Sequence, residues 1–245
     1  MDLHDIILTA LIFGAALLYA SVGHAGASGY LAAMALMGVA PAVMKPTALS
    51  LNVLVAVVAT YRFYRVGAFS HRLFWPLALA SIPLAFIGGT LSLPSHYYKP
   101  LVGALLIYAA WRSFKTASTA ADISIQPVGI PTLLVIGASL GLLSGLTGVG
   151  GGIFLSPILI FFRWADTKVV SGIAAAFIFV NSVAGLLGVM THTQTLPASL
   201  PYWAIAAVIG GFVGAGLGSR KLGNPTIQRL LALVLLVAGL KMMLT

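Results

Sequence analysis

Long apolar stretches separated by short polar segments run along nearly the whole chain. They cover eight ranges: 6–39, 47–61, 73–93, 101–111, 130–162, 169–190, 200–217 and 227–244. A helix needs about 20 apolar residues to cross the hydrocarbon core of a bilayer. Repeated blocks of this kind predict an all-α integral membrane protein.

The first and fifth blocks are too long for one ordinary span. Ile6–Val39 has 34 residues and Ile130–Phe162 has 33, and glycine-rich segments at 21–29 and 144–152 interrupt them. Each glycine weakens a helix by about 1 kcal/mol relative to alanine, so both segments are predicted to be unwound. Each block is then either one kinked, tilted helix or a hairpin whose tip lies inside the bilayer.

The two halves of the chain repeat one order of features. A broken apolar block is followed by a small-residue helix with one asparagine (Asn52, Asn181), a glycine-rich helix and a Leu/Val/Ala-rich helix. The glycine-rich helices, at 88–89 and 210–218, are predicted to pack closely. The polar segment 115–126 separates the halves, so we expect two membrane repeats, 1–115 and 129–245, joined by a linker at 116–128.

The distribution of lysine and arginine discriminates between a kinked span and a hairpin. If each broken block is a single span, six cationic residues fall on one face of the membrane and seven on the other. If each block returns to its starting face, ten share one face and three, Lys45, Lys99 and Lys241, lie opposite. Cytoplasmic loops are enriched in Lys and Arg, so the hairpin is favoured.

A hairpin and three transmembrane helices in each half define a topology. Because three crossings are an odd number, the second half enters the bilayer from the opposite side, and the halves form inverted-topology repeats. We therefore expect a multi-pass protein of the cell (inner or plasma) membrane, with both termini external and the linker cytoplasmic.

Composition excludes several classes of protein. Hydrophobic residues make up 60% of the chain and charged residues 7%, whereas soluble domains have about 25% charged residues. A soluble enzyme and a nucleic-acid-binding domain are therefore excluded, and the net charge of +9 is attributed to cytoplasmic loops. The absence of cysteine excludes thiolate metal sites and disulfides.

Several chemistries also lack the residues they need. The chain has no glutamate, and its four aspartates lie in tails or loops, so no proton relay through embedded carboxylates is expected. No Walker motif is present, and the histidines are scattered without metal-ligand spacing. The sequence therefore predicts no cofactor, no metal site and no catalytic residue.

The glycine breaks are the candidate binding site. Secondary transporters with inverted repeats bind substrate near the midplane, at interrupted helices, and a helix that restarts there directs free N–H groups and a positive dipole end toward an anion. The second-half helix should restart near Ile153. The predicted substrate-binding residues are Ser21, His24, Gly26, Ser28, Gly29, Asn52, Ser144, Thr147, Gly148, Gly150, Gly151, Gly152 and Asn181.

Each of these residue types has a purely structural alternative. The glycines can serve close helix packing, the hydroxyls can bond carbonyls of their own helix, and Asn52 and Asn181 can form interhelical hydrogen bonds. His24 can be a neutral packing residue. Lys45 can snorkel from a helix end or attract anions at an external vestibule. The sequence leaves these alternatives open.

The segment from Gly148 to Pro157, GVGGGIFLSP, resembles the GxGGGxxxxP signature of the sulfite exporter TauE/SafE family of membrane permeases. The lead-in SGLT at 144–147, the twofold repeat, the length and a weaker first-half copy ending at Pro41 are also similar to that family. The first half departs from the pattern, because His24 and Ala25 stand in the glycine-rich segment and Ala27-Ser28-Gly29 replaces the triple glycine. The resemblance implies transport of small sulfur-containing anions or organic acids, such as sulfite, sulfonates or sulfoacetate.

The sequence thus predicts a secondary transporter, not an enzyme, that moves a small anion across the cytoplasmic membrane by alternating access. A passive anion channel of the same architecture is one alternative. The other is an intramembrane serine hydrolase with Ser21 or Ser28 as nucleophile and His24 as base. The expected partners are the small anion and the lipid bilayer, and a coupling proton or sodium ion and a homo-oligomer are left open.

Overall fold

The computed structural model describes residues 3–115, 125–192, 196–220 and 225–244, without the side chains of 112–115, 219–220, 225–232 and 234. These residues form helices and no strand, which confirms the all-α prediction. The helices are α1 (Leu3–Ala20), α2 (Ala27–Leu36), α3 (Pro41–Arg65), α4 (His71–Thr90), α5 (Ser95–Lys115), α6 (Ile130–Thr147), α7 (Gly152–Phe161), α8 (Thr167–Met190), α9 (Leu200–Arg220) and α10 (Pro225–Leu244).

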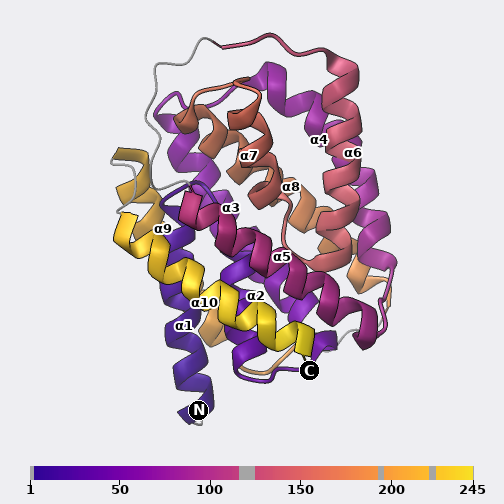
Figure 1. The fold of residues 1–245 in the computed structure, drawn as a ribbon, viewed down its shortest axis with the longest axis vertical. Coiled ribbons are helices and arrows are strands. Elements are labelled where there is room, and N and C mark those ends of the chain that lie inside the picture. The colour runs from indigo at the N-terminus through magenta and orange to yellow at the C-terminus, as the bar shows by residue number, and fades with distance from the viewer. Residues whose placement is uncertain (1–2, 116–124, 193–195, 221–224, 245) are drawn as a thin grey trace.

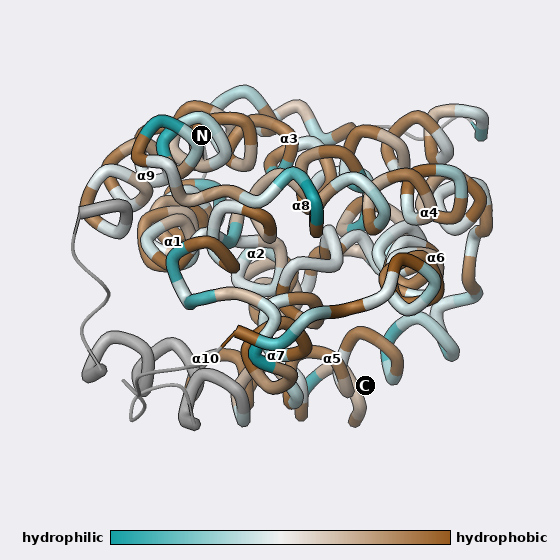
Figure 2. Tube along the Cα trace, turned by 90° about the horizontal axis from the view of Figure 1, so that it is seen from above, coloured by the Kyte–Doolittle hydropathy of each residue, from teal (hydrophilic) through white to brown (hydrophobic). Residues whose placement is uncertain are grey.

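Six described helices are long and apolar enough to cross a membrane: α1, α3, α4, α6, α8 and α9. Large apolar side chains also face outward, among them Leu79, Val135 and Ile205, each at least 60% exposed. Figure 2 shows hydrophobic residues along most of the helices, while the hydrophilic ones gather mainly at turns. An apolar outer surface of this extent suits lipid, and the chain is a multi-pass membrane protein.

These six helices are not the six full spans that the sequence predicts. The prediction counts α5 and α10 as spans, and treats α1 and α6 as the first arms of hairpins. In the structure α1 and α6 have 18 residues each and are long and apolar enough to span by themselves. The side chains of 112–115 in α5 and of 225–232 and 234 in α10 lie outside the described residues, so these two spans stay predictions.

The helices α1 and α6 are each followed by a short helix, α2 or α7, that returns toward the end of the molecule at which α1 or α6 began. At the first pair, the Nε2 atom of His4, at the start of α1, lies 2.9 Å from the carbonyl oxygen of Met37, just after α2. At the second pair, the backbone N–H of Gln126, before α6, donates to the carbonyl of Arg163, after α7, at 2.8 Å. The helical winding is interrupted at 21–26 and 148–151, within the two segments predicted to be unwound.

Helix packing follows a twofold pattern. α4 packs on α6 as α9 packs on α1, α4 packs on α8 as α9 packs on α3, and α3–α8 and α5–α10 pair across the halves. In Figure 1, α1 begins at the lower end of the molecule, whereas α6 begins at the upper end. This pairing is what two inverted repeats would produce. The inverted relation and the division at 1–115 and 129–245 stay predictions, and most of the predicted linker, 116–124, lies outside the described residues.

Glycines allow the paired helices to approach closely. A Cβ atom at Gly141 of α6 would lie 2.6 Å from the Cα of Ser81 in α4, and one at Gly210 of α9 would lie 2.5 Å from the carbonyl oxygen of Phe13 in α1. Gly88 and Gly89 meet the backbones of α6 and α8 in the same way. The predicted close-packing role of the glycine-rich helices α4 and α9 is therefore confirmed.

Candidate functional site

The second break, residues 148–151, is held open by glycines in a left-handed conformation. Gly148, Gly150 and Gly151 have φ angles of 82°, 82° and 78°, which side chains with a Cβ adopt only at a cost. Gly148 ends α6, and Gly151 begins α7 without a side-chain cap. The first N–H groups of a helix have no partner within the helix, so this end of α7 offers donors and the positive end of its dipole.

The first break, residues 21–26, has a similar left-handed start but a longer turn. Gly23 and Gly26 have positive φ, and Gly26 begins α2 without a side-chain cap. Gly29 lies inside α2, where a Cβ would approach the Cβ of Ala15 to 2.6 Å. Gly29 therefore packs α2 against α1, as Gly152 packs α7 against Ile178 of α8.

The turns of the two breaks rest on the facing helices α3 and α8. A Cβ at Gly148 would lie 3.3 Å from the Cα of Lys45, near the start of α3, and one at Gly23 would lie 2.6 Å from the Cα of Ser171, near the start of α8. Gly172, beside Ser171, packs on Ala68 just after α3 ends. The two turns thus lie toward opposite ends of the α3–α8 pair.

What connects the two breaks is His24 and α7. The Nε2 atom of His24 lies 3.2 Å from the hydroxyl of Ser156 in α7, and its Nδ1 lies 3.1 Å from the carbonyl oxygen of Val22. Val149 of the second break is buried in the same apolar cluster as α2. The first break therefore contacts, through His24, the helix that begins at the second break.

Polar side chains from α3 and α8 surround the second break. The Nδ2 atom of Asn52 and the hydroxyl of Ser182 lie 3.0 Å and 3.2 Å from the position that a Cβ of Gly150 would occupy. On α8, Phe177 faces Gly151 and Gly185 faces Gly145. Asn181 lies one turn from each of them, on the face of α8 that packs against the end of α6 and the second break.

These polar groups are buried without partners. Asn52, Ser144, Asn181 and Ser182 have no exposed surface. Both amide atoms of Asn52, the two serine hydroxyls and the Oδ1 of Asn181 make no hydrogen bond. Leaving a buried polar group unsatisfied costs about 1–3 kcal/mol, so the polar atoms gathered around the second break are costly without a partner.

Asn52, Ser144 and Asn181 are among the substrate-binding residues predicted from the sequence, and Ser182 is not. Ser182 follows Asn181 directly in the small-residue helix α8, and that position was the only available signal. Thr147, also predicted, donates its hydroxyl to the carbonyl of Leu143 in its own helix at 2.7 Å, which is the structural alternative. Its carbonyl accepts the hydroxyl of Tyr98 at 3.1 Å.

Polar groups at the first break are mostly paired within the break itself. The Ser21 hydroxyl donates to the carbonyl of Leu18 at 2.6 Å, and the Tyr30 hydroxyl donates to that of Ala25. Ser28 is buried beside the hydroxyl of Tyr19, which has no hydrogen bond of good geometry. The first break is thus largely closed on itself.

The ammonium group of Lys45 is bound by backbone carbonyls of the protein. Its Nζ donates to the carbonyl oxygens of Gly88, Gly89 and Leu91 at 3.0, 3.1 and 3.0 Å. These carbonyls are at the C-terminus of α4, where the helix dipole is negative. Lys45 therefore caps the C-terminus of α4, and its backbone lies next to Gly148 of the second break.

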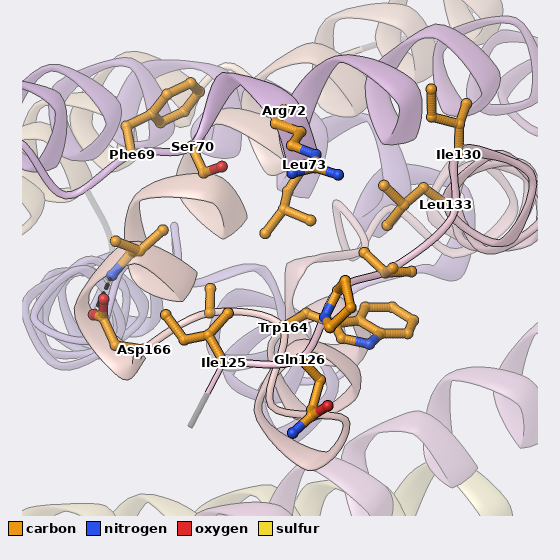
Figure 3. Close-up of a pocket in the computed structure, with 14 residues that line it drawn as sticks. Phe69, Ser70, Arg72, Leu73, Ile125, Gln126, Ile130, Leu133, Trp164 and Asp166 are labelled. Carbon is orange, nitrogen blue, oxygen red and sulfur yellow. Dashed lines mark hydrogen bonds between the residues drawn. The ribbon is translucent and has the colours of Figure 1, made fainter. Parts of the chain in front are cut away.

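A cavity of about 430 Å³ lies elsewhere, at the end of the molecule where α4, α6 and α8 begin. Figure 3 shows Arg72 and Leu73 from α4, Ile130 and Leu133 from α6, and Trp164 among its lining residues. Asp166 at its edge is engaged as the cap of α8, accepting the N–H groups of Lys168 and Val169. None of the predicted site residues lines this cavity.

A helical membrane bundle whose helices are interrupted at buried glycine turns is the build of secondary transporters, and this chain is a membrane transport protein. It belongs to the sulfite exporter TauE/SafE family, whose sequence profile matches residues 8–242. The chain is also 39% identical over 246 residues to the "Probable membrane transporter protein y4hK" of Sinorhizobium fredii (strain NBRC 101917 / NGR234), a match that covers 99% of this chain and all of that protein. No solved structure matches the chain. The family and this relative point to a transporter rather than an enzyme.

Proposed function

We propose that the protein is a secondary transporter that moves a small sulfur-containing anion, of the sulfite, sulfonate or sulfoacetate class, across the cytoplasmic membrane by alternating access. The observation that carries the proposal is the set of four buried polar side chains around the second break, each with at least one polar atom that makes no hydrogen bond: Asn52, Ser144, Asn181 and Ser182. The family description, which names sulfite, supports the class of substrate.

The anion is held by neutral donors at the start of α7. The uncapped N–H groups after Gly151 and the positive end of the α7 dipole attract negative charge. The Nδ2 of Asn52 and the Ser182 hydroxyl, which converge on Gly150, supply further donors to sulfite oxygens. Gly148, Gly150 and Gly151 give the anion close access to the backbone.

The first break forms the side of this site that moves during transport. His24 contacts α7 through Ser156, and Gly26 and Ser28 lie at the start of α2, directly after His24 in the chain. Ser21 and Gly29 shape the turn and its packing on α1. Rocking of one hairpin against the other would expose the site alternately to each side, with both termini external and the 116–128 linker in the cytoplasm.

A flux screen on the purified protein in liposomes tests the proposal. Sulfite, thiosulfate, sulfate, taurine, sulfoacetate and small carboxylates are offered in turn, and we expect saturable uptake and counterflow for one or more of the sulfur-containing anions. Flux without counterflow and above carrier rates would favour a passive channel. Absence of flux for all the sulfur-containing anions would contradict the proposal.

A pair of glycine variants locates the site. Gly151→Leu places a side chain within 2.9 Å of the ring of Phe177, at a φ of +78°, and is expected to abolish sulfite transport. Gly38→Leu is the matched control, because Gly38 has a φ of +73° with open space around it and carries the same backbone strain of about 1–2 kcal/mol. Both variants are checked for membrane insertion and a monodisperse elution profile. Normal transport by an inserted Gly151→Leu protein would rule out the site.

A further inference from the structure

One hydrogen bond orients the Asn181 amide, and its oxygen has no partner. Its Nδ2 donates to the carbonyl of Phe177 at 2.8 Å, so the amide cannot flip without losing this bond. Its Oδ1 is fully buried and unpaired. An amide oxygen is an acceptor only, and an oxyanion, which is also an acceptor, cannot satisfy it.

Other oxygen atoms that can act as acceptors or cation ligands are buried around the same break. The hydroxyl oxygens of Ser144 and Ser182 and the Oδ1 of Asn52 are unpaired and buried around the same break. The C-terminal end of α6, at Thr147 and Gly148, brings the negative end of a helix dipole to this point. In transporters with interrupted helices, unwound backbone carbonyls and the C-terminal ends of half-helices coordinate sodium.

We propose that the second break holds a sodium ion, coordinated by the Oδ1 atoms of Asn181 and Asn52 and the hydroxyls of Ser144 and Ser182, at the C-terminal end of α6. This inference rests on the proposed function, because the ion is the coupling partner of the transported anion. The anion takes the donors at the start of α7, and the cation takes the oxygens at the end of α6. The two ends of one break thus serve opposite charges.

Charge balance explains why the two ions bind together. The described aspartates, Asp5 and Asp166, lie in the first turn of α1 and at the cap of α8, away from the break. Lys45, the cation next to Gly148, is occupied by the carbonyls at the end of α4. Among the described residues no acidic or basic side chain pairs with either ion at the break, so sodium and the anion each raise the affinity of the site for the other by the same factor.

The first experiment measures sodium binding without any transport. The melting temperature of the detergent-purified protein is compared in sodium, potassium and choline chloride at equal ionic strength. We expect sodium, at about tenfold its dissociation constant, to raise the melting temperature by about 4 °C. The shift should vanish in Asn181→Leu and in Ser182→Ala. Ser139→Ala is the control, since Ser139 is exposed on α6 and donates within its own helix, and it should keep the full shift.

The second experiment measures coupling in liposomes. Replacing external sodium by choline should lower the rate of sulfite uptake at least tenfold, and the residual uptake by Asn181→Leu should be equally slow in sodium and in choline. An equal thermal shift in potassium, or an unchanged shift in both variants, would overturn the sodium site, and so would the absence of any shift, in which case water fills the break.

The two proposals fail in different ways. If sulfite is carried equally well without sodium, the sodium site is wrong and the transport function stands. If sodium stabilises the protein through Asn181 and Ser182 but none of the sulfur-containing anions moves, the sodium site stands and the proposed function is wrong.

Discussion

The two breaks in this fold look alike in the backbone and differ in what surrounds them. Both begin a half-helix at a left-handed, uncapped glycine, Gly26 or Gly151. At the first break the hydroxyl of Ser21 and both ring nitrogens of His24 have protein partners. At the second break both amide atoms of Asn52, the Oδ1 of Asn181 and the hydroxyls of Ser144 and Ser182 have none. The two interruptions thus differ in how far the protein itself satisfies the polar groups beside them.

Turn length accounts for part of this difference. Six residues at 21–26 provide side chains that pair with nearby backbone carbonyls. The second turn has four residues, three of them glycines in the left-handed region, so it has few side chains with which to pair. The polar groups that face it come from α3 and α8, and a buried polar group without a partner is costly. In the proposed function, the bound anion and the sodium ion compensate for the cost of burying these polar groups.

The largest expected effect concerns the helices that support the two turns. Lys45 lies next to Gly148 and donates to three carbonyls at the C-terminus of α4. Ser171 lies next to Gly23, and its hydroxyl donates to the carbonyl of Thr167 in its own helix. Lys45→Met should lower the unfolding free energy by about 2–3 kcal/mol, because three helix-terminal carbonyls lose their charged donor. This corresponds to a fall of about 4–12 °C in melting temperature.

Ser171→Ala serves as the counterpart and should change the melting temperature by less than about 2 °C. Equal melting temperatures for Lys45→Met and the unmodified protein would mean that the second turn is not supported through α4. Lys45→Arg, which keeps the charge and the donors, should recover part of the loss.

The sequence predicted the breaks because glycine acts locally. Runs such as 148–152 disfavour a helix whatever surrounds them, and the long blocks and spaced asparagines identified α3 and α8 as the helices that carry polar groups. Three facts depend on packing between distant segments and could not be read from the pattern. These are the capping of α4 by Lys45, the orphaned hydroxyl of Ser182, and the location of the two turns at opposite ends of the α3–α8 pair.

An intermediate effect is expected where the two breaks communicate. The contact of His24 with Ser156 is a side-chain link between the first break and α7. His24→Ala and Ser156→Ala should each lower sulfite transport about fivefold, the equivalent of about 1 kcal/mol. In a double-mutant cycle the combined variant should be no worse than His24→Ala alone, because both changes remove the same bond. Strictly additive losses would show that the two residues act separately.

The smallest effect falls on Ser21, and it sharpens the comparison most directly. Ser21 and Ser144 occupy corresponding places at the starts of the two glycine-rich segments. Ser21 donates to Leu18 three residues earlier, whereas the Ser144 hydroxyl is buried and unpaired. Ser21→Ala should therefore change the initial rate of sulfite uptake by less than about twofold, and Ser144→Ala should lower it about tenfold. A symmetric site shared by both breaks predicts similar losses for the two variants, so comparable rates would refute the assignment of the ligand to the second break alone.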